Sequence, residues 1–354
     1  MQPPPTAAQD FAALDPDLVL DALASVGLMG DGRLMALNSY ENRVFLVHLE
    51  TAVAGAASAA VVAKFYRPGR WSEAQIAEEH SFSLELANNE VPVVAPLLLD
   101  GKTLHQHGGF YFSVSPYRGG RAPELDDDEV LEWVGRFLAR LHDVGTRSAF
   151  VHRPALNLQT FGQEPRSWLL ENDFLPLDVR RSWEEKSASA IELIASFAEL
   201  TGAEGIRSTE TSGLRRLRLH GDCHPGNILW TPLDAAASAG PGPHFVDLDD
   251  ARTGFAVQDL WMLVSGERAQ RQRQLGMLVD GYEQFREFDR RELALIEPLR
   301  TLRLIHYSAW LARRWDDPTF RHHFPWFGSS DYWQGQVQML DEQMEAMQEE
   351  PLIV

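Results

Sequence analysis

Cysteine is almost absent from this chain of 354 residues, in which Cys223 is the single example. One cysteine cannot form an internal disulfide, and such scarcity is typical of a reducing compartment. Long apolar runs are missing as well, since no segment approaches the roughly 20 consecutive apolar residues that a membrane helix needs. The N-terminus, Met1-Gln2-Pro3-Pro4-Pro5, lacks the basic and apolar regions of a signal peptide. These absences predict a cytoplasmic protein that does not bind membranes.

Positive charge is also scarce, because 32 Lys and Arg residues face 51 Asp and Glu residues, for a formal net charge of −19. A surface of this sign repels nucleic acid and anionic lipid, so we expect neither as a partner. ATP is an anion too, and a nucleotide site in this chain would need local positive charge from magnesium, a lysine and backbone N–H groups. With 44% hydrophobic residues, the chain can bury a full core and divide into two lobes.

Two segments carry the strongest chemical signal: Leu219 to Leu229 (LHGDCHPGNIL) and Phe245 to Asp249 (FVDLD). Asp222 and Asn227 are five positions apart, the separation of the base and the metal-binding Asn in a protein-kinase catalytic loop. At this spacing Asp222 would accept the proton of an acceptor hydroxyl while Asn227 reaches magnesium. Asp247 adds a carboxylate, an oxygen ligand of the kind that magnesium prefers. The pattern predicts a phosphotransferase.

Two other interpretations fit the first segment. His220 and His224 are four residues apart, as metal ligands on a helix face would be, but the glycine and proline residues around them disfavour a helix. Asp222 and Asn227 would also suit a polar turn before a strand. The second carboxylate, Asp247, favours the phosphotransferase interpretation because a plain turn does not need it.

A nucleotide site also needs a lysine and a phosphate-covering loop. Lys64 ends the apolar strand Val62-Ala63-Lys64-Phe65, as does the lysine that contacts the α and β phosphates in kinases. The acid that holds its ammonium is expected on the next helix, where Glu79 is preferred over Glu78. The turn from Leu37 to Arg43 contains no glycine, so Ser39 and nearby backbone N–H groups would contact phosphate. A solvated lysine and a plain surface turn are the simpler alternatives.

Hydrophobic periodicity predicts a different secondary structure for the two parts of the chain. The first part should contain a helix from Asp15-Pro16, strands at 33–38, 43–50 and 59–66, a helix at 72–89, and two strands that flank Asp100-Gly101 and end near Pro116. The second should contain helices from about 126, at 177–200 and from 257 onward, and a strand at 214–219. We therefore predict an α+β fold of two lobes. Residues 1–116 would form a nucleotide-binding lobe with a small antiparallel sheet, and residues 117–354 a larger, mainly helical catalytic and substrate-binding lobe.

Over most of its length the chain resembles the aminoglycoside phosphotransferase and choline kinase group, a branch of the protein-kinase-like fold. The motifs that carry the resemblance are LNSYENRV (37–44), KFYRP (64–68), LHGDCHPGNILW (219–230), FVDLDDAR (245–252) and VQDLWML (257–263). They are most similar to bacterial serine/threonine protein kinases that act in stress survival. The resemblance implies ATP and Mg²⁺ as cofactors and a protein substrate with a Ser or Thr acceptor. We expect the chain to act as a monomer.

The resemblance also implies a role for each matching residue. Asp222 and Asp247 would be catalytic, Asn227 and Asp247 would bind the metal, and Ser39, Lys64 and Glu79 would bind the nucleotide. Asp259 would bind the backbone of the catalytic loop, which is a structural role. The chain departs from ordinary protein kinases because His-Gly-Asp replaces H-R-D, Asp-Leu-Asp replaces D-F-G, and no A-P-E segment is evident.

These departures leave other functions open. Control by activation-loop phosphorylation is not expected, because the Arg that would pair with such a phosphate is missing beside Asp222. Cys223 next to the base suggests a redox switch, but a structural thiol is the preferred interpretation. A small-molecule kinase for an aminoglycoside, choline or amino alcohol is one rival, since the negative charge suits a cationic acceptor. A pseudokinase that binds nucleotide without turnover is the other.

Overall fold

The structure is a computed structural model that describes residues 11–53, 58–201, 213–232 and 240–354. The chain divides into two compact units, each discontinuous in sequence. The first unit contains the residues up to Pro123 and the segment Gly226–Asp249, and the second contains Glu124–Pro225 and Asp250–Val354. The functions predicted for lobes 1–116 and 117–354 stay predictions, but the segment Gly226–Asp249 groups with the first unit.

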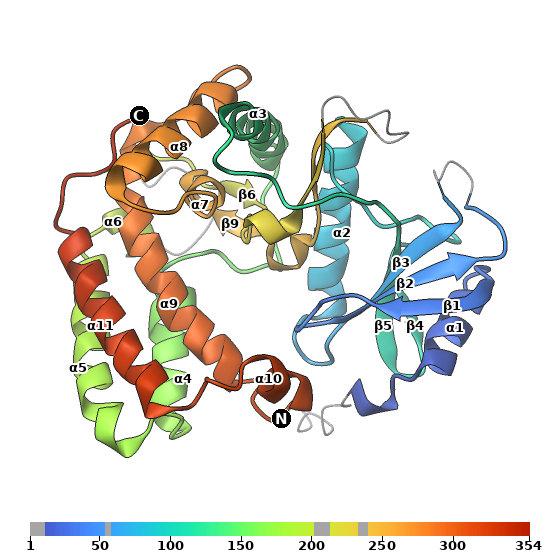
Figure 1. The fold of residues 1–354 in the computed structure, drawn as a ribbon, viewed down its shortest axis with the longest axis horizontal. Coiled ribbons are helices and arrows are strands. Elements are labelled where there is room, and N and C mark those ends of the chain that lie inside the picture. The colour runs from blue at the N-terminus through green and yellow to red at the C-terminus, as the bar shows by residue number, and fades with distance from the viewer. Residues whose placement is uncertain (1–10, 54–57, 202–212, 233–239) are drawn as a thin grey trace. The chain divides into compact units, whose positions relative to one another are not determined.

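An antiparallel sheet of five strands forms the body of the first unit, with the order β1-β2-β3-β5-β4 (Figure 1). Its strands are β1 (Gly30–Ala36), β2 (Arg43–Leu49), β3 (Ala60–Phe65), β4 (His105–His107) and β5 (Phe110–Pro116). On β3, Val61, Ala63 and Phe65 have no exposed surface and alternate with more accessible residues, so one face of the strand is buried. Lys64 therefore points away from that apolar face.

Helices α1 (Pro16–Ala24) and α2 (Glu73–Asn88) belong to the same unit. Ser72 begins α2 with a capping box, in which its hydroxyl oxygen accepts the Gln75 backbone N–H and the Gln75 side chain accepts the Ser72 N–H. Asp15 caps α1 by accepting the Leu18 N–H at 2.8 Å. The predictions of a helix after Asp15 and of a helix that begins at Ser72 are confirmed.

The hairpin before Pro116 differs from its prediction. The two strands do not flank Asp100-Gly101, because β4 and β5 lie later and turn at Gly108-Gly109. Around Asp100 the backbone forms only the isolated bridge between Leu99 and Lys102. Both turns contain two successive residues with positive φ, so the local sequence suits either position. Pairing of β5 with β3 decides between them, and this contact is not visible in the local pattern.

The segment Gly226–Asp249 joins the first unit through the hairpin of β7 (Ile228–Thr231) and β8 (Gly242–Phe245). The Phe245 N–H donates to the Pro92 carbonyl at 2.8 Å, and the Val94 N–H donates to the Phe245 carbonyl at 3.0 Å. These bonds tie the hairpin to the chain that follows α2. Most of the predicted Pro/Gly/Ala-rich insert 232–243, and part of the predicted loop 52–60, lie outside the described residues.

The second unit is mainly helical (Figure 1). Its α-helices are α3 (Asp128–Gly145), α4 (Glu164–Glu171), α5 (Leu177–Ile194), α6 (Ala198–Thr201), α7 (Val257–Trp261), α8 (Arg268–Tyr282), α9 (Ile296–Ala312), α10 (Pro318–His323) and α11 (Ser330–Ala346). A Cβ at Gly135 of α3 would lie 2.0 Å from the Leu278 carbonyl oxygen, and a Cβ at Gly281 of α8 would lie 2.0 Å from the Glu132 carbonyl oxygen. Glycine at both positions lets the two backbones touch.

Helix α9 is held by an aromatic and aliphatic core. Trp183 of α5 and Trp333 of α11 are buried and pack edge to face, with ring centroids 5.6 Å apart. Ile305 and Ala309 of α9 belong to the same buried cluster. A short antiparallel pair, β6 (Leu217–Leu219) with β9 (Arg252–Gly254), completes the unit, so the strand predicted at 214–219 begins later than expected. Within the described parts of the chain, no helix is both long and apolar enough to cross a bilayer.

Candidate active site

Asp222 belongs to the second unit and follows β6, just before the 3-10 turn η3 (Pro225–Asn227). The preceding Gly221 has φ 83°, in the left-handed region, and a Cβ there would lie 2.2 Å from the Asp250 carbonyl oxygen. Only glycine fits this backbone without strain. The backbone conformation that leads into Asp222 therefore depends on a residue with no side chain.

Asp259 of α7 holds the same stretch of backbone through hydrogen bonds. Its side chain is fully buried and accepts the backbone N–H groups of His220 and Gly221, both at 2.9 Å. His142 Nε2 lies 2.9 Å from the Asp259 carboxylate, and His142 Nδ1 lies 3.0 Å from the Tyr282 hydroxyl. Burial lowers the pKa of His142 against the opposing effect of Asp259, so a neutral ring donates to the carboxylate. The predicted structural role of Asp259 is confirmed.

Two nitrogen-bearing side chains lie beside the Asp222 carboxylate. Arg303 Nη1, from α9, is 2.7 Å from Oδ1, and His224 Nε2 is 3.6 Å from Oδ2. The prediction missed Arg303, because it considered only the residues next to Asp222 in sequence. No sequence signal marks this arginine, since α9 also carries Arg300 one turn earlier.

The residues around Asp222 also bear on the zinc site and on the redox switch that were considered from the sequence. Residues 220–224 lie outside any helix, with His220 buried and the His224 side chain 40% exposed, so the two rings do not share a helix face. This arrangement does not support a zinc site. Cys223 is buried, and burial raises the pKa of its thiol, with Asp259 and Asp222 adding to the effect. A thiol that stays protonated supports the structural interpretation.

Asn227 and Asp247 lie at the end of the β7–β8 hairpin opposite to its connecting loop. Ile228 pairs with Phe245, and the Val246 N–H donates to the Asn227 carbonyl at 3.0 Å. Asp247 follows with φ 59°, a left-handed conformation that residues other than glycine rarely adopt and that is common at functional sites. Its side chain is 51% exposed. The hairpin thus brings an amide and a carboxylate, both oxygen donors suited to Mg²⁺, to neighbouring positions.

Lys64 of β3 is paired with both acids of the Asp-Leu-Asp segment. Its Nζ lies 2.8 Å from Asp247 Oδ1 and 3.3 Å from Asp249 Oδ1. Burial alone would lower the pKa of Lys64, but the carboxylates of Asp247, Asp249 and Glu79 together raise it well above its usual value. Glu79 of α2 is buried, whereas Glu78 is half-buried. Glu79 is therefore the better placed of the two candidate acids, although its role stays a prediction.

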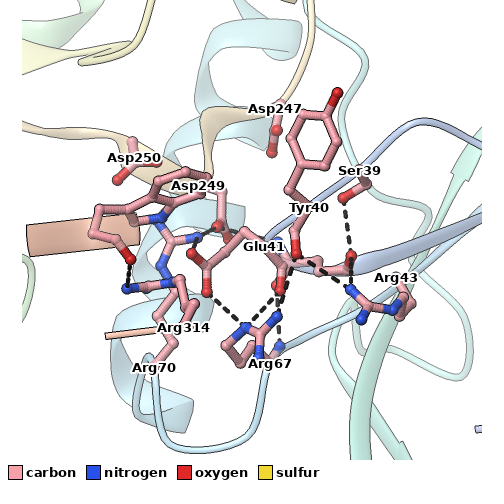
Figure 2. A network of polar contacts seen from close by, with 12 residues as sticks. Ser39, Tyr40, Glu41, Arg43, Arg67, Arg70, Asp247, Asp249, Asp250 and Arg314 are labelled. Carbon is pink, nitrogen blue, oxygen red and sulfur yellow. Dashed lines mark hydrogen bonds and ion pairs between the residues drawn. The ribbon is translucent and has the colours of Figure 1, made fainter. Parts of the chain in front are cut away.

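Asp249 also anchors a polar network that the sequence did not reveal (Figure 2). Its buried carboxylate accepts a hydrogen bond from Asn42 Nδ2 at 3.1 Å and is ion-paired with Arg70. Arg70 Nη1 lies 3.7 Å from Glu41 Oε2, and Arg67 Nε lies 3.0 Å from Glu41 Oε1. The network therefore ties the β1–β2 turn and the loop after β3 to the segment 247–249. The motifs FVDLDDAR and KFYRP contain some of these residues, but spacing alone gave them no partners.

Ser39 lies in the β1–β2 turn and closes it. Its hydroxyl donates to the Asn42 carbonyl at 3.0 Å (Figure 2). Asn42 is buried, and its Oδ1 accepts the Arg67 backbone N–H at 3.0 Å. Side chains therefore order this glycine-free turn, whereas a glycine-rich loop would leave its backbone more freedom. Contact of Ser39 with phosphate stays a prediction.

Known proteins of similar sequence agree with this chemistry. Residues 34–296 match the phosphotransferase enzyme family. Stress response kinase A of Escherichia coli (strain K12) is 44% identical over 342 residues, which cover 97% of this chain and 96% of that protein. A serine/threonine protein kinase named RdoA, from Salmonella typhimurium, is 43% identical over 344 residues with the same two shares. Among solved structures, an amicoumacin kinase in complex with AMP-PNP and Ca²⁺ has a TM-score of 0.66 at 18% identity, covering 96% of this chain and 95% of that one.

The fold is that of solved kinases such as the amicoumacin kinase, so the predicted α+β fold is confirmed. The chain belongs to the phosphotransferase enzyme family, because the family match covers more than half of its length. It is a phosphotransferase, as the sequence predicted. At 18% identity the likeness to the amicoumacin kinase shows the fold alone.

Proposed function

We propose that this phosphotransferase is a cytoplasmic serine/threonine protein kinase that uses ATP and Mg²⁺ and acts in a stress response. The observation that carries the proposal is the 44% identity to stress response kinase A over 97% of this chain. A match of this extent includes the regions that would bind an acceptor as well as the motifs that bind nucleotide. The serine/threonine acceptor is suggested by the name of the Salmonella relative.

The nucleotide side of the reaction is assigned to Lys64, Asn227 and Asp247. The oxygen donors of Asn227 and Asp247 suit Mg²⁺, which when bound there would screen the negative charge of the phosphates. Lys64, charged because its pKa is raised, would contact the α and β phosphates in exchange for part of its pairing with Asp247. Glu79 would balance the charge of that ammonium, and Ser39 would contact phosphate from the β1–β2 turn.

The acceptor side is assigned to Asp222. Its carboxylate would orient a serine or threonine hydroxyl and take its proton while the acceptor oxygen bonds to the γ-phosphorus. The bond between that phosphorus and the β,γ-bridging oxygen breaks, and ADP leaves. Five residue steps separate Asp222 from Asn227, which limits their Cα separation to roughly 18 Å in any arrangement of the two units. The short stretch of chain between them therefore allows Asp222 and Asn227 to act on the same phosphoryl group.

A small-molecule kinase is the second candidate, because the net charge of −19 suits a cationic acceptor. The immediate surroundings of Asp222 argue against it. Arg303 lies 2.7 Å from the carboxylate, and a guanidinium there would repel an ammonium group next to the acceptor hydroxyl.

The test is a labelling experiment with γ-labelled ATP and Mg²⁺. The protein is incubated with a bacterial protein extract and, separately, with a panel of aminoglycosides, choline and amino alcohols. We expect label on serine or threonine of extract proteins, and Asp222→Asn should lower it by about 10²-fold or more, which shows that the label comes from this enzyme. Label only on small molecules would contradict the proposal. Nucleotide binding without label anywhere would indicate a pseudokinase.

A further inference from the structure

We infer that Arg303 is a positioning residue for phosphoryl transfer, which holds the Asp222 carboxylate in the orientation that meets the acceptor hydroxyl. This inference rests on the proposed role of Asp222 as the base. It goes further because it assigns a reaction role to a residue on α9, far from every motif of the nucleotide and catalytic segments.

The contact is short and partly shielded from solvent. Arg303 Nη1 lies 2.7 Å from Asp222 Oδ1, so the two opposite charges form a close ion pair. The two side chains are 34% and 23% exposed. Partial burial strengthens an ion pair relative to one in open solvent, where such pairs contribute little. The pair is therefore able to restrict the rotation of the Asp222 side chain.

A rigid element delivers the guanidinium. Leu302 is fully buried, Ile305 is 1% exposed, and Thr301 is fully buried, so the turn of α9 that carries Arg303 is anchored in the core. Groups that position a reacting side chain are most effective when their own attachment is fixed. Arginine suits this task because its planar fork keeps a defined direction toward a carboxylate, whereas an ammonium is a point charge.

The orientation of the Asp222 side chain depends on its side-chain neighbours, of which Arg303 at 2.7 Å is closer than His224 at 3.6 Å. Asp259 binds the N–H groups of His220 and Gly221, which fixes the path of the chain but not the side-chain torsions of Asp222. Arg303 acts directly on the carboxylate. Misplacing a reacting group by about 1 Å can cost on the order of 10²-fold in rate. Loss of Arg303 should therefore slow transfer without changing nucleotide affinity.

The chain offers a matched control on the same helix. Arg300 lies one turn before Arg303, has a side chain 31% exposed, and pairs with Glu297 at 3.6 Å. Arg300→Gln removes the same charge from the same helix, but the ion pair that it breaks is with Glu297 rather than with Asp222. It separates a positioning effect from a general effect of charge or helix stability.

The experiment compares Arg303→Gln, Arg303→Lys, Arg300→Gln, Asp222→Asn and the double variant Asp222→Asn/Arg303→Gln. Transfer from labelled MgATP to the molecules of a cell extract gives the rate, nucleotide titration gives Kd, and thermal unfolding checks the fold. We expect Arg303→Gln to lower the rate by about 10²-fold with Kd within about twofold, Arg303→Lys to recover part of the rate, and Arg300→Gln to stay within about twofold of the parent protein.

The double variant tests whether Arg303 acts through Asp222. In the Asp222→Asn background, Arg303→Gln should lower the remaining rate by less than about threefold, because contacting residues are not additive. An equal loss in both backgrounds, or an Arg303→Gln rate equal to that of Arg300→Gln, would overturn the inference while leaving the proposed function intact. If Arg303→Gln does not fold, Arg303→Met takes its place as a variant of similar length without charge, and a parent-like rate of that variant would overturn the inference. A parent-like rate of Asp222→Asn would instead refute the role of Asp222, and the inference with it.

Discussion

The residues proposed to act on the nucleotide, Lys64 and Asp247 among them, and the proposed base Asp222 are held mainly by different kinds of interaction. They are called here the nucleotide group and the acceptor group. In the first unit, Lys64 is shared between the carboxylates of Asp247 and Asp249, and Asp249 is also paired with Arg70. In the second unit, the backbone before Asp222 is held by hydrogen bonds to the fully buried Asp259. Ion pairs therefore dominate around Lys64, whereas buried hydrogen bonds hold the backbone that leads into Asp222.

This difference matches what each group is proposed to do. A lysine that receives phosphate must exchange its protein partners for those of the ligand, and the half-exposed Asp247 is a partner that it can release. A base must instead keep one orientation toward the acceptor, because transfer depends on precise geometry. The comparison indicates that ion pairs suit side chains that exchange partners on binding. Buried hydrogen bonds suit the backbone before the base, and the Asp222 carboxylate itself has an ion pair with Arg303.

The largest expected effect on folding comes from Asp259. Asp259→Ala leaves the His220 and Gly221 N–H groups and the His142 ring without their buried acceptor, so we expect a loss of about 3–5 kcal/mol in the free energy of unfolding. Urea unfolding measures it. Asp143→Ala, at a 58% exposed side chain, is the control and should change stability by at most about 0.5 kcal/mol. Equal losses in the two variants would remove the distinction between the groups.

Replacing Asp249 should destabilise the fold less, because its partners Lys64 and Arg70 each keep a second carboxylate, Asp247 and Glu41 respectively. Asp249→Asn keeps the size of the side chain but leaves Lys64 and Arg70 without a shared negative partner, and we expect a loss of about 2 kcal/mol. Unfolding in urea measures this loss, and nucleotide titration should show weaker binding. A variant with parent-like stability and nucleotide affinity would show that the network in Figure 2 does not support the nucleotide group.

Glu292 should make the free energy of unfolding depend on pH, through the helix that carries Asp259. Its Oε2 accepts the Val257 N–H at 2.8 Å, at the start of the helix that carries Asp259, and burial raises the pKa of Glu292 to about 8. In the unfolded chain the pKa of a Glu side chain is roughly 4.3. The folded state therefore holds the proton more tightly, and the stability from this group is full below about pH 4 and is lost as the pH rises to about 8.

Replacing Glu292 by glutamine tests this dependence. Glu292→Gln keeps an acceptor for the Val257 N–H and removes the titration. Between pH 5 and 8 the free energy of unfolding of the parent protein should fall further than that of the variant, by about 1–3 kcal/mol. Urea titrations at pH 5, 6.5 and 8 measure the difference. Parallel pH profiles would mean that Glu292 does not titrate in this range.

The smallest effect is expected at Cys223. Burial raises the pKa of its thiol, so a thiol reagent should label the native protein at least about 100-fold more slowly than the unfolded protein, with no loss of transfer activity. Labelling kinetics with and without urea measure this ratio. Fast labelling that stops transfer would favour the redox switch and would add a reactive group to the acceptor side.

Most of the fold could be predicted because its signals are local. Caps such as Ser72 and apolar periodicity placed α1, α2, α3 and β1 to β3 to within a few residues, whereas from 257 onward they predicted helical structure without the bounds of single helices. The hairpin before Pro116 was misassigned because two turn-forming pairs compete there and only pairing with β3 decides. The return of Gly226–Asp249 to the first unit was also missed, since it depends on hydrogen bonds to Pro92 and Val94.

In the candidate site, too, local patterns were predictable from the sequence and contacts between distant residues were not. The positions of Asp222, Asn227, Asp247 and Lys64 follow from motif spacing and strand context, which are visible in sequence. Arg303 could not be predicted, because its contact with Asp222 depends on how α9 packs in the second unit. The pairing of Asp249 with Arg70 was missed for the same reason, although both residues lie in or near motifs that were recognised.

The most direct test of the account compares Asp222→Asn with Asp247→Asn in paired measurements of Mg²⁺-dependent ATP binding and phosphoryl transfer. We predict that Asp222→Asn binds MgATP like the parent protein but transfers about 10²-fold more slowly or worse, whereas Asp247→Asn loses both Mg²⁺-dependent binding and transfer. Parent-like transfer by Asp222→Asn, or parent-like MgATP binding by Asp247→Asn, would contradict the division into an acceptor group and a nucleotide group.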